Sequence, residues 1–323
     1  MKVFITRKIP DIGVKLLRNS GFKVKVYEGK KPITTKELIT IGKDFDAIIT
    51  MLTDKVDENV ISHFNKLKII SNFAVGYNNI DIDAAGKRGI YVTNTPGVLT
   101  ESTADTAFAL LITAARRIIE CDKFMREGKF IGWDPLLLLG MEMSGKTVGI
   151  IGAGRIGSAL ARRCSGFNMK ILYSSRNKNE YLENTLKAKK VSLMALLQKS
   201  DFISIHVPLN KDTYHLIGKK EIELMKKTAV FVNTARGEVV DEKELIKALK
   251  SKKIFAAGFD VYEGEPKVNK ELFKLDNVVL LPHVGSATFE SRSKIAELDA
   301  KNVILALKGK KPVHLVNKKY FDD

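Results

Sequence analysis

The chain has 323 residues, 45% of them hydrophobic, and carries a formal net charge of +17. This length allows two domains of ordinary size with real hydrophobic cores. The longest apolar stretches fall far short of the ~18 residues that a membrane-spanning helix requires, so we expect no membrane segment. The N-terminus reads as a strand and shows no signal-peptide pattern. The two cysteines, Cys121 and Cys164, have no metal-binding spacing, which favours a reducing, cytoplasmic location.

The positive charge is spread along the chain. Lysines occur as scattered pairs such as Lys30-Lys31, Lys189-Lys190 and Lys310-Lys311, with no basic tail and no basic run interleaved with aromatic residues. Such pairs are typical of solvated helix and loop surfaces. We therefore expect no nucleic-acid partner, although the charge would attract anionic substrates and phosphorylated cofactors.

The first hundred residues alternate between apolar runs and amphipathic segments. The predicted strands cover residues 3–6, 24–27, 47–50, 68–71 and 89–92. The predicted helices cover residues 11–19, 57–64 and 83–87, with a further helix that is capped by Thr34 or Thr35 and runs to residue 41. A stretch rich in Ala and Leu, without Gly or Pro, then predicts one long helix over residues 100–120.

The second half of the chain continues this alternation. The predicted strands cover residues 147–151, 170–173, 202–206, 229–233, 256–259 and 278–281, and the helices include residues 156–164, 193–199, 219–224, 242–250 and 288–307. The pattern predicts an α/β fold with two doubly wound parallel-sheet domains and a cleft between them. We expect residues 1–99 and 287–323 to form a flavodoxin-like substrate domain. Residues 100–286 are then expected to form a Rossmann, dinucleotide-binding domain.

The most informative motif is Gly152-Ala153-Gly154-Arg155-Ile156-Gly157, which follows an apolar strand and opens a helix. In this pattern Gly152 allows a tight turn, Gly154 leaves room for a pyrophosphate, and Gly157 lets helix and strand pack closely. The free N–H groups at the helix start would face the phosphates. The alternative interpretation is a Gly-rich turn without a ligand.

Three groups with complementary chemistry follow three later strands: Arg236, the acids Glu263 and Glu265, and His283. They suit reduction of a 2-oxo acid, because a guanidinium binds a carboxylate bidentately and an imidazole exchanges a proton near neutral pH. A carboxylate beside the imidazole would favour its protonated form. A nicotinamide would carry the hydride, so no metal is required.

Each of these residues also has a structural alternative when it is taken alone. Arg236 could form a surface salt bridge, the two acids could be solvated loop residues, and a strand-end histidine such as His206 or His215 is more often structural. The combination of groups carries the chemical interpretation.

These motifs together resemble the D-isomer-specific 2-hydroxyacid dehydrogenase family over nearly the whole chain. The resemblance rests on the Gly-rich turn and on the segments Asn233-Thr234-Ala235-Arg236-Gly237, Asp260-Val261-Tyr262-Glu263-Gly264-Glu265-Pro266 and Pro282-His283. It implies that Arg236 binds the substrate carboxylate, that His283 is the acid–base group, and that Glu265 rather than Glu263 is its partner.

The resemblance also assigns binding residues. Leu52 would lie over the substrate pocket, and the backbone N–H groups of Val75 and Gly76 would bind the substrate carboxylate. The cofactor would contact residues of several loops, namely Thr103, Gly152, Gly154, Arg155, Ile156, Gly157, Ser174, Ser175, Arg176, His206, Pro208, Thr234, Asp260, His283 and Gly285.

The cofactor prediction depends on the end of the second strand of the dinucleotide half. NAD-binding sites usually carry an acid there for the ribose 2′-hydroxyl. The chain instead has Ser174, Ser175, Arg176 and Lys178, and Arg176 can pair with a 2′-phosphate. We therefore predict NADP(H) as the preferred cofactor and NAD(H) as a weaker one, with stacking of Arg176 on adenine as the alternative.

Within the family, the segments 173–176 and 50–57 resemble the glyoxylate and hydroxypyruvate reductases. We therefore expect reduction of these small 2-oxo acids to D-2-hydroxy acids. By the same resemblance, Trp133 reaches into the neighbouring site of a homodimer, while a plain core or interface aromatic is the alternative. Oxidation of 3-phosphoglycerate or phosphite stays open, and formate oxidation is disfavoured because that branch has Gln where Glu265 stands. Outside enzymes, the alternative is an NADP-sensing, corepressor-like binding protein.

Overall fold

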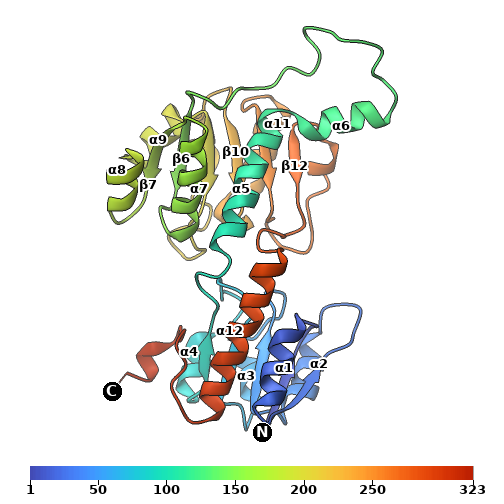
Figure 1. Cartoon of the computed structure of the whole chain (residues 1–323), viewed down its shortest axis with the longest axis vertical. Coiled ribbons are helices and arrows are strands. Elements are labelled where there is room, and N and C mark those ends of the chain that lie inside the picture. Colours follow the sequence, from blue (N-terminus) through green and yellow to red (C-terminus); the bar gives the residue numbers. More distant parts are fainter. Residues whose placement is uncertain (323) are drawn as a thin grey trace. The chain divides into compact units, whose positions relative to one another are not determined.

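The computed structural model describes residues 1–322, and the chain divides into two compact units. Unit 1 comprises Met1–Leu99 and Ser286–Asp323, and unit 2 comprises Thr100–Gly285. Each unit consists of a parallel sheet covered by helices (Figure 1). No helix within residues 1–322 combines the length and the apolar character that crossing a lipid bilayer would demand.

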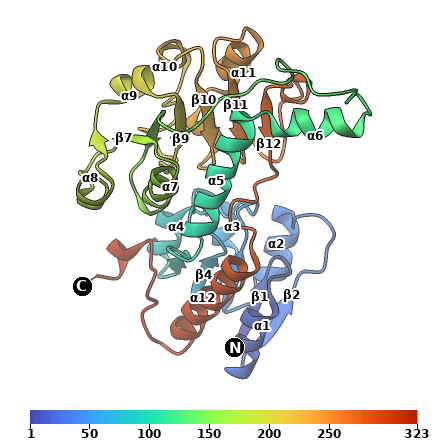
Figure 2. The same ribbon diagram turned by 45° about the horizontal axis from the view of Figure 1, so that its top comes forward.

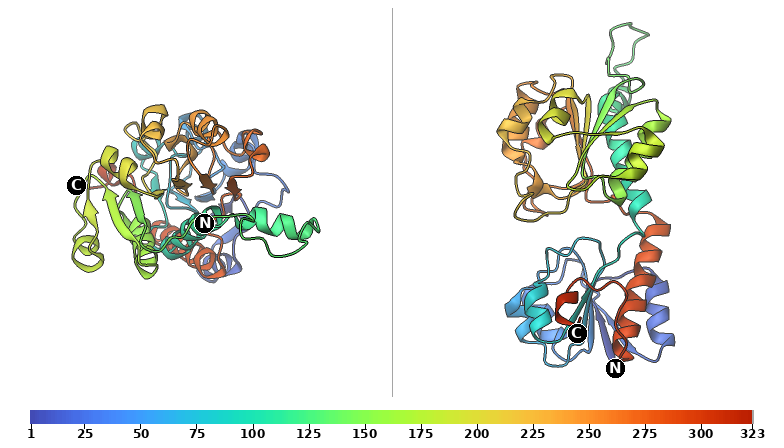
Figure 3. Two further views of the ribbon diagram at one scale, coloured as in Figure 1. Left: turned by 90° about the horizontal axis from the view of Figure 1, so that it is seen from above. Right: turned by 90° about the vertical axis from the view of Figure 1, so that its left-hand side faces the viewer.

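The described part of unit 1 contains a five-stranded parallel sheet with the strand order β2-β1-β3-β4-β5. The strands are β1 (Lys2–Ile5), β2 (Lys23–Val26), β3 (Ala47–Thr50), β4 (Ile69–Asn72) and β5 (Tyr91–Thr93). Helices α1 (Asp11–Asn19) and α12 (Phe289–Leu307) pack together on one face, and Figure 3 shows α4 (Ile82–Lys87) on the other face. Helices α2 (Thr35–Gly42) and α3 (Glu58–Ser62) share the core of that second face.

Local sequence signals define several helix starts in unit 1. Thr34 caps α2 in a reciprocal arrangement: its hydroxyl accepts from Glu37 N, and its own N–H donates to Glu37 Oε2 over 2.8 Å. Asp57 and Asp81 cap α3 and α4 with side-chain oxygens that accept from backbone N–H groups.

Unit 2, all of which the structure describes, contains a seven-stranded parallel sheet with the order β12-β11-β10-β9-β6-β7-β8. The strands are β6 (Thr147–Ile151), β7 (Lys170–Ser174), β8 (Lys189–Lys190), β9 (Phe202–Ile205), β10 (Val230–Asn233), β11 (Ala256–Phe259) and β12 (Val278–Leu280). The first strand, β6, lies inside the sheet, and the chain adds strands to both sides of it. The predicted doubly wound fold class is therefore confirmed for both units.

Two apolar cores enclose the sheet of unit 2, one on each face. Helices α5 (Thr100–Ala115), α7 (Arg155–Gly166) and α8 (Glu180–Leu186) contribute to one core. Helices α9 (Leu193–Lys199), α10 (Lys219–Glu223) and α11 (Glu242–Lys250) contribute to the other. The central strands β9 and β10 are buried along their whole length, as a parallel sheet covered on both faces requires.

The prediction of a single helix over residues 100–120 is wrong. The chain breaks after α5. Arg117, the residue that precedes α6 (Ile118–Arg126), has a left-handed backbone with a φ of 55°. Arg117 is held there by Glu120, with an Nη2–Oε2 distance of 2.7 Å. In Figures 1 and 2, α6 and the chain after it extend away from the sheet of unit 2. The prediction also lacked α8 and β8, and several strand bounds differ by one or two residues.

Candidate active site and cofactor site

The Gly-rich turn after β6 has the backbone form that a pyrophosphate site requires. Gly152 has a φ of +98°, and a Cβ on Gly157 would lie 2.2 Å from the carbonyl oxygen of Gly152, so this close packing of helix and strand needs glycine. A Cβ on Gly154 would meet no atom within 4 Å. Gly154 is also the N-cap of α7, a twelve-residue helix whose first N–H groups receive no side-chain cap from it. The turn therefore fits a bound pyrophosphate.

The ends of the two strands beside β6 lie against this turn. Gly152 N donates to Ser174 O over 2.9 Å at the end of β7. A Cβ on Gly152 would lie 2.7 Å from the carbonyl of His206, which follows β9. Desolvation lowers the pKa of His206 to about 3, so the ring is neutral, and its Nε2 lies 2.9 Å from Ser204 Oγ. Two residues after His206, Pro208 O accepts from the hydroxyl of Thr213 over 2.6 Å, and this bond fixes the loop after β9.

The loop after β7 carries the residues predicted to select the cofactor. Ser174 and Ser175 are partly exposed and Arg176 is exposed. Asn179 connects this loop to the Gly-rich turn, because its Nδ2 donates to Ala153 O over 2.8 Å and to Ser158 Oγ over 3.0 Å. Asn179 is not among the site residues that the sequence predicts.

Arg236 follows β10 on a loop that is closed by the last residue of that strand. Asn233 Nδ2 donates to Arg236 O over 2.8 Å, and Asn233 Oδ1 accepts from Ala235 N over 3.0 Å. Burial lowers the pKa of the Arg236 guanidinium, while the negative charges of Glu265 and Glu238 oppose this effect. Arginine nevertheless stays protonated in proteins, so the site holds a fixed positive charge.

Thr234 and Thr103 supply hydroxyl groups near the ends of the strands. Thr234 Oγ1 is buried and, within residues 1–322, has no hydrogen-bond partner. A buried hydroxyl without a partner is costly, so it fits a ligand that would supply one. Thr103 is buried in the first part of α5, and its side chain lies next to Gly285.

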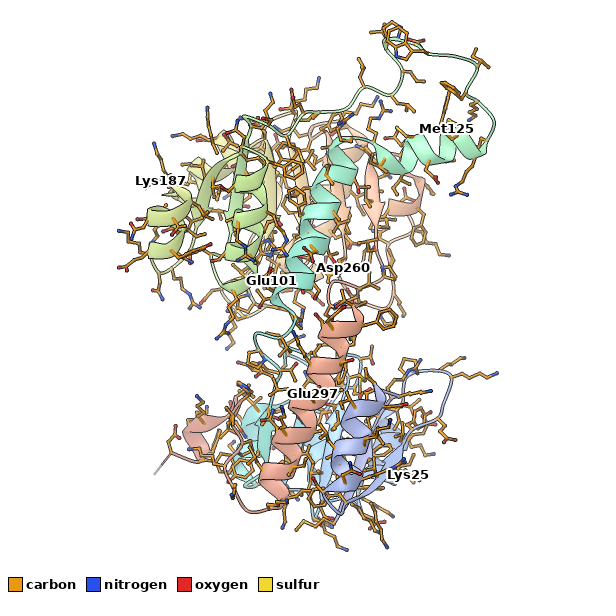
Figure 4. All side chains as sticks on the ribbon, in the orientation of Figure 1. Lys25, Glu101, Met125, Lys187, Asp260 and Glu297 are labelled. Carbon is orange, nitrogen blue, oxygen red and sulfur yellow. The ribbon has the colours of Figure 1, made fainter. Side chains whose placement is uncertain are left out.

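Asp260 holds the turn that follows His283. Its Oδ1 accepts from Val284 N and its Oδ2 accepts from Gly285 N, both over 2.7 Å. Burial raises the pKa of Asp260, and these two N–H groups oppose that effect. Figure 4 shows Asp260 at the same end of unit 2 as Glu101, in the first turn of α5. The predicted contact of Asp260 with the cofactor stays a prediction.

The structure brings His283 and Glu265 into direct contact. His283 Nδ1 lies 2.8 Å from Glu265 Oε2, and Glu265 Oε1 accepts from Tyr262 N over 2.9 Å. Burial raises the pKa of Glu265, but the hydrogen bond and charge of His283, with smaller effects of Tyr262 N–H and Arg236, leave it below its ordinary value. The carboxylate is therefore ionised near neutral pH, so Nδ1 carries the proton of this hydrogen bond.

The loops that carry the guanidinium and the acid are packed directly together. A Cβ on Gly237, next to Arg236, would lie 1.9 Å from the carbonyl carbon of Tyr262. The charge of Glu265 also acts on Arg236. His283 itself has a φ of 55°, an uncommon backbone conformation for a residue other than glycine. The three predicted groups thus belong to one site at the carboxyl edge of the unit 2 sheet.

The acid next to this pair has a histidine partner of its own. Glu263 Oε1 lies 2.9 Å from His215 Nε2, and the Tyr214 ring stacks on the His215 ring with centroids 4.1 Å apart. Glu263 N also donates to Glu242 Oε2 over 3.1 Å. No sequence motif links His215 to Glu263, because the two residues lie 48 positions apart.

The predicted substrate residues of unit 1 lie in the loops after β3 and β4. Leu52 is partly exposed in the turn after β3. After β4, Val75 O accepts from Asn94 Nδ2 and Gly76 O accepts from Asn72 Nδ2, both over 2.7 Å. Within the described residues neither Val75 N nor Gly76 N donates a hydrogen bond. These two N–H groups are therefore available to an anion.

The geometry of unit 2 defines a class of protein. A pyrophosphate-binding turn and an imidazole–carboxylate pair with a neighbouring guanidinium lie along one edge of a Rossmann-type sheet. Such a site belongs to a dehydrogenase that uses a nicotinamide dinucleotide.

Comparison with known proteins identifies the family. Residues 108–285 match the model of the D-isomer specific 2-hydroxyacid dehydrogenase, NAD binding domain. Over 321 residues the chain is 54% identical to a glyoxylate reductase of Thermococcus litoralis, covering 98% of this chain and 97% of the relative. The chain belongs to the D-isomer-specific 2-hydroxyacid dehydrogenase family, which confirms the predicted resemblance and the predicted enzyme class.

Two solved structures have the same fold over almost the full length. The TT0316 protein from Thermus thermophilus is 38% identical, with a TM-score of 0.92, and the match covers 98% of this chain and 100% of that one. An NADPH-dependent glyoxylate/hydroxypyruvate reductase from Sinorhizobium meliloti, in complex with NADP and malonate, is 31% identical with a TM-score of 0.87. That match covers 100% of this chain and 98% of the other.

Proposed function

We propose that the protein reduces small 2-oxo acids, glyoxylate and hydroxypyruvate, to D-2-hydroxy acids, with NADPH as the preferred reductant. The observation that carries this proposal is the 2.8 Å contact between His283 Nδ1 and Glu265 Oε2, beside the guanidinium of Arg236. The glyoxylate reductase of Thermococcus litoralis, with 54% identity, supports the choice of substrate.

The mechanism follows from the charges of the site. Arg236 binds the substrate carboxylate and polarises the oxo group, since its planar fork matches a carboxylate. When bound, the reduced nicotinamide supplies the hydride. His283 donates a proton from Nε2 to the oxygen that becomes the hydroxyl, because Nδ1 is engaged by Glu265. Glu265 fixes the ring and stabilises its protonated form.

In this mechanism the dinucleotide is assigned to unit 2, and further substrate-binding residues are assigned to unit 1. Unit 2 holds the dinucleotide, with its pyrophosphate on the Gly-rich turn and Thr103, His206, Pro208, Thr234 and Asp260 around it. Unit 1 supplies the substrate residues, and the free N–H groups of Val75 and Gly76 support their assignment to the substrate carboxylate. Leu52 is assigned to the same substrate.

The preference for NADPH rests on the loop after β7. It presents Ser174, Ser175 and Arg176 and no acid, so a 2′-phosphate meets a cation and two hydroxyl groups instead of a carboxylate. The relative from Sinorhizobium meliloti, which is NADPH-dependent, supports this proposal. NAD(H) serves as the weaker cofactor.

The protein is further proposed to act as a homodimer in the cytoplasm. The segment after α6 exposes large apolar side chains, including Ile131 at 100% and Trp133 at 85%, and a second copy of the chain would cover them. Both cysteines are free thiols, which agrees with a reducing compartment. Light scattering on the purified protein tests the dimer, and a monomer would refute it.

The decisive experiment is a substrate panel with both cofactors. We expect turnover of glyoxylate and hydroxypyruvate, followed by loss of the reduced nicotinamide absorbance, with the higher kcat/KM for NADPH. Turnover of 3-phosphohydroxypyruvate alone would overturn the substrate assignment. Binding of NADP(H) without turnover of any 2-oxo acid would support a sensing protein instead.

A further inference from the structure

Two lysines flank the loop after β7, and only one of them has a carboxylate partner. Lys178 Nζ lies 3.0 Å from Glu183 Oε2, and Glu183 Oε1 accepts from Tyr173 OH over 2.7 Å. Hydrogen bonds from Tyr173 and Lys178 hold the pKa of Glu183 below its ordinary value. The charge of Lys178 is therefore balanced by this ionised acid.

Lys190 occupies a different position. It ends β8, where it pairs in parallel register with Tyr173 of β7, and its Nζ donates to Arg176 O over 3.1 Å. Within residues 1–322, no carboxylate lies within ion-pair distance of this ammonium group. The positive charge of Lys190 therefore lies at the backbone of the cofactor-selecting loop. It helps to lower the pKa of Glu183 from a distance, but the ion pair of Glu183 is with Lys178.

The loop is also fixed relative to the Gly-rich turn. The side chain of Asn179 donates to Ala153 O in that turn and accepts from Leu182 N at the start of α8. Asn179 N donates in turn to the hydroxyl of the fully buried Tyr173 over 3.0 Å. Asn179 therefore fixes the distance between a pyrophosphate on the Gly-rich turn and a positive charge on the loop after β7. Recognition of a 2′-phosphate on the same cofactor requires such a fixed distance.

We propose that Lys190 supplies a second positive charge for the 2′-phosphate of the bound cofactor, beside Arg176. This inference rests on the proposed NADPH preference. It assigns Lys190 as a residue that sets how strongly NADPH is preferred over NADH. A ribose phosphate carries a charge of about −1.5 to −2 near neutral pH, so one guanidinium leaves it only partly neutralised. An ammonium group is a compact point charge with three donors, and it can complete the neutralisation from a neighbouring strand.

The chain offers a matched control. Lys189 is the preceding residue of β8, is also exposed, and points to the opposite side of the strand. Lys190→Gln and Lys189→Gln change the net charge equally. Lys190→Arg restores a cation at the tested position.

The experiment measures inhibition of the full enzyme by 2′-AMP and by 5′-AMP, together with kcat/KM for NADPH and for NADH. For Lys190→Gln we expect inhibition by 2′-AMP and kcat/KM for NADPH to weaken roughly tenfold, as for one lost charge-assisted hydrogen bond. Inhibition by 5′-AMP and use of NADH should stay unchanged, Lys189→Gln should match wild type, and Lys190→Arg should recover most of the loss.

Two failures can be told apart. If wild type prefers NADPH but Lys190→Gln behaves like Lys189→Gln, the role of Lys190 is refuted and the proposed function stands. If wild type binds 2′-AMP no better than 5′-AMP and prefers NADH, the NADPH preference fails and the role of Lys190 fails with it.

Discussion

His283 with Glu265 and His215 with Glu263 form two imidazole–carboxylate pairs in unit 2, and the two acids lie on the same loop after β11. The nitrogen–oxygen distances are 2.8 and 2.9 Å, and the side chains are 32% and 33% exposed in the first pair and 30% and 29% in the second. Both histidines have left-handed backbones, with φ values of 55° and 48°. Distance, exposure and backbone strain therefore do not distinguish a site for proton transfer from a structural contact.

The ring nitrogen in use distinguishes them. His283 contacts its acid through Nδ1, which leaves Nε2, the nitrogen farther from the backbone, for a ligand. His215 contacts its acid through Nε2, which leaves only Nδ1, and its ring is covered by Tyr214. The charge of Arg236 acts on Glu265, whereas Glu263 N donates to the buried acid Glu242. We therefore propose that the first pair transfers the proton and that the second pair anchors the loop.

Removal of the first imidazole should have the largest effect on the reaction. We expect His283→Ala to lower kcat for glyoxylate reduction by a hundredfold or more, within the ~10²–10⁴-fold range of general acid catalysis. NADPH binding, measured by fluorescence titration, should weaken far less than kcat falls, because His283 is only one of many residues assigned to the cofactor. An unchanged kcat would show that the proton comes from another group.

Removal of the Arg236 guanidinium should have the second-largest effect on the reaction. Arg236→Ala takes away charge-assisted hydrogen bonds to the substrate carboxylate, worth roughly 2–3 kcal/mol, so kcat/KM should fall about 30- to 150-fold. Arg236→Lys keeps the charge but loses the planar fork, and should recover only part of this loss. Steady-state kinetics with glyoxylate measure both variants, and equal values for Arg236→Lys and wild type would contradict bidentate binding.

The sequence alone predicted the parts of the site that depend on local signals. The Gly-rich turn is visible because its backbone needs glycine at Gly152 and Gly157, and the ends of apolar strands place Arg236 and His283 at one sheet edge. The doubly wound sheets follow from the same alternation of apolar strands and helices.

The missed features depend on contacts between distant residues or on a local conformation that carries no composition signal. Lys190 reaches Arg176 only because β8 pairs with β7, and Glu263 meets His215 across 48 residues of chain. The break between α5 and α6 occurs without Gly or Pro, since Arg117 is held in its left-handed conformation by Glu120. Propensity alone could not reveal these features.

Loss of the first carboxylate should change the pH dependence as well as the rate. Burial alone would raise the pKa of Glu265, but His283, the N–H of Tyr262 and the charge of Arg236 together hold it below its ordinary value, so the acid is ionised across the neutral range. Glu265→Gln removes that charge, and the protonated imidazole loses its stabilisation. We expect kcat to fall about tenfold, in line with one charged hydrogen bond, and the alkaline loss of reductase activity to begin at lower pH. An alkaline limb that stays in place would contradict the role of Glu265.

Loss of the His215–Glu263 pair should have the smallest effect on the reaction. This variant tests whether the two imidazole–carboxylate pairs have separate roles. His215→Ala leaves Glu263 partly exposed and still anchored through its N–H to Glu242, so water can replace the imidazole. A partly exposed pair of this kind is worth about 0–1 kcal/mol, so we expect kcat to stay within about threefold of wild type and Tm to fall by a few degrees. The pH profile of glyoxylate reduction should keep its shape, because the charge on Glu265 and the hydrogen bond to His283 are untouched. A His215→Ala variant whose profile moves as that of Glu265→Gln does would show that the two pairs act as one unit, and that loop anchoring and proton transfer cannot be separated.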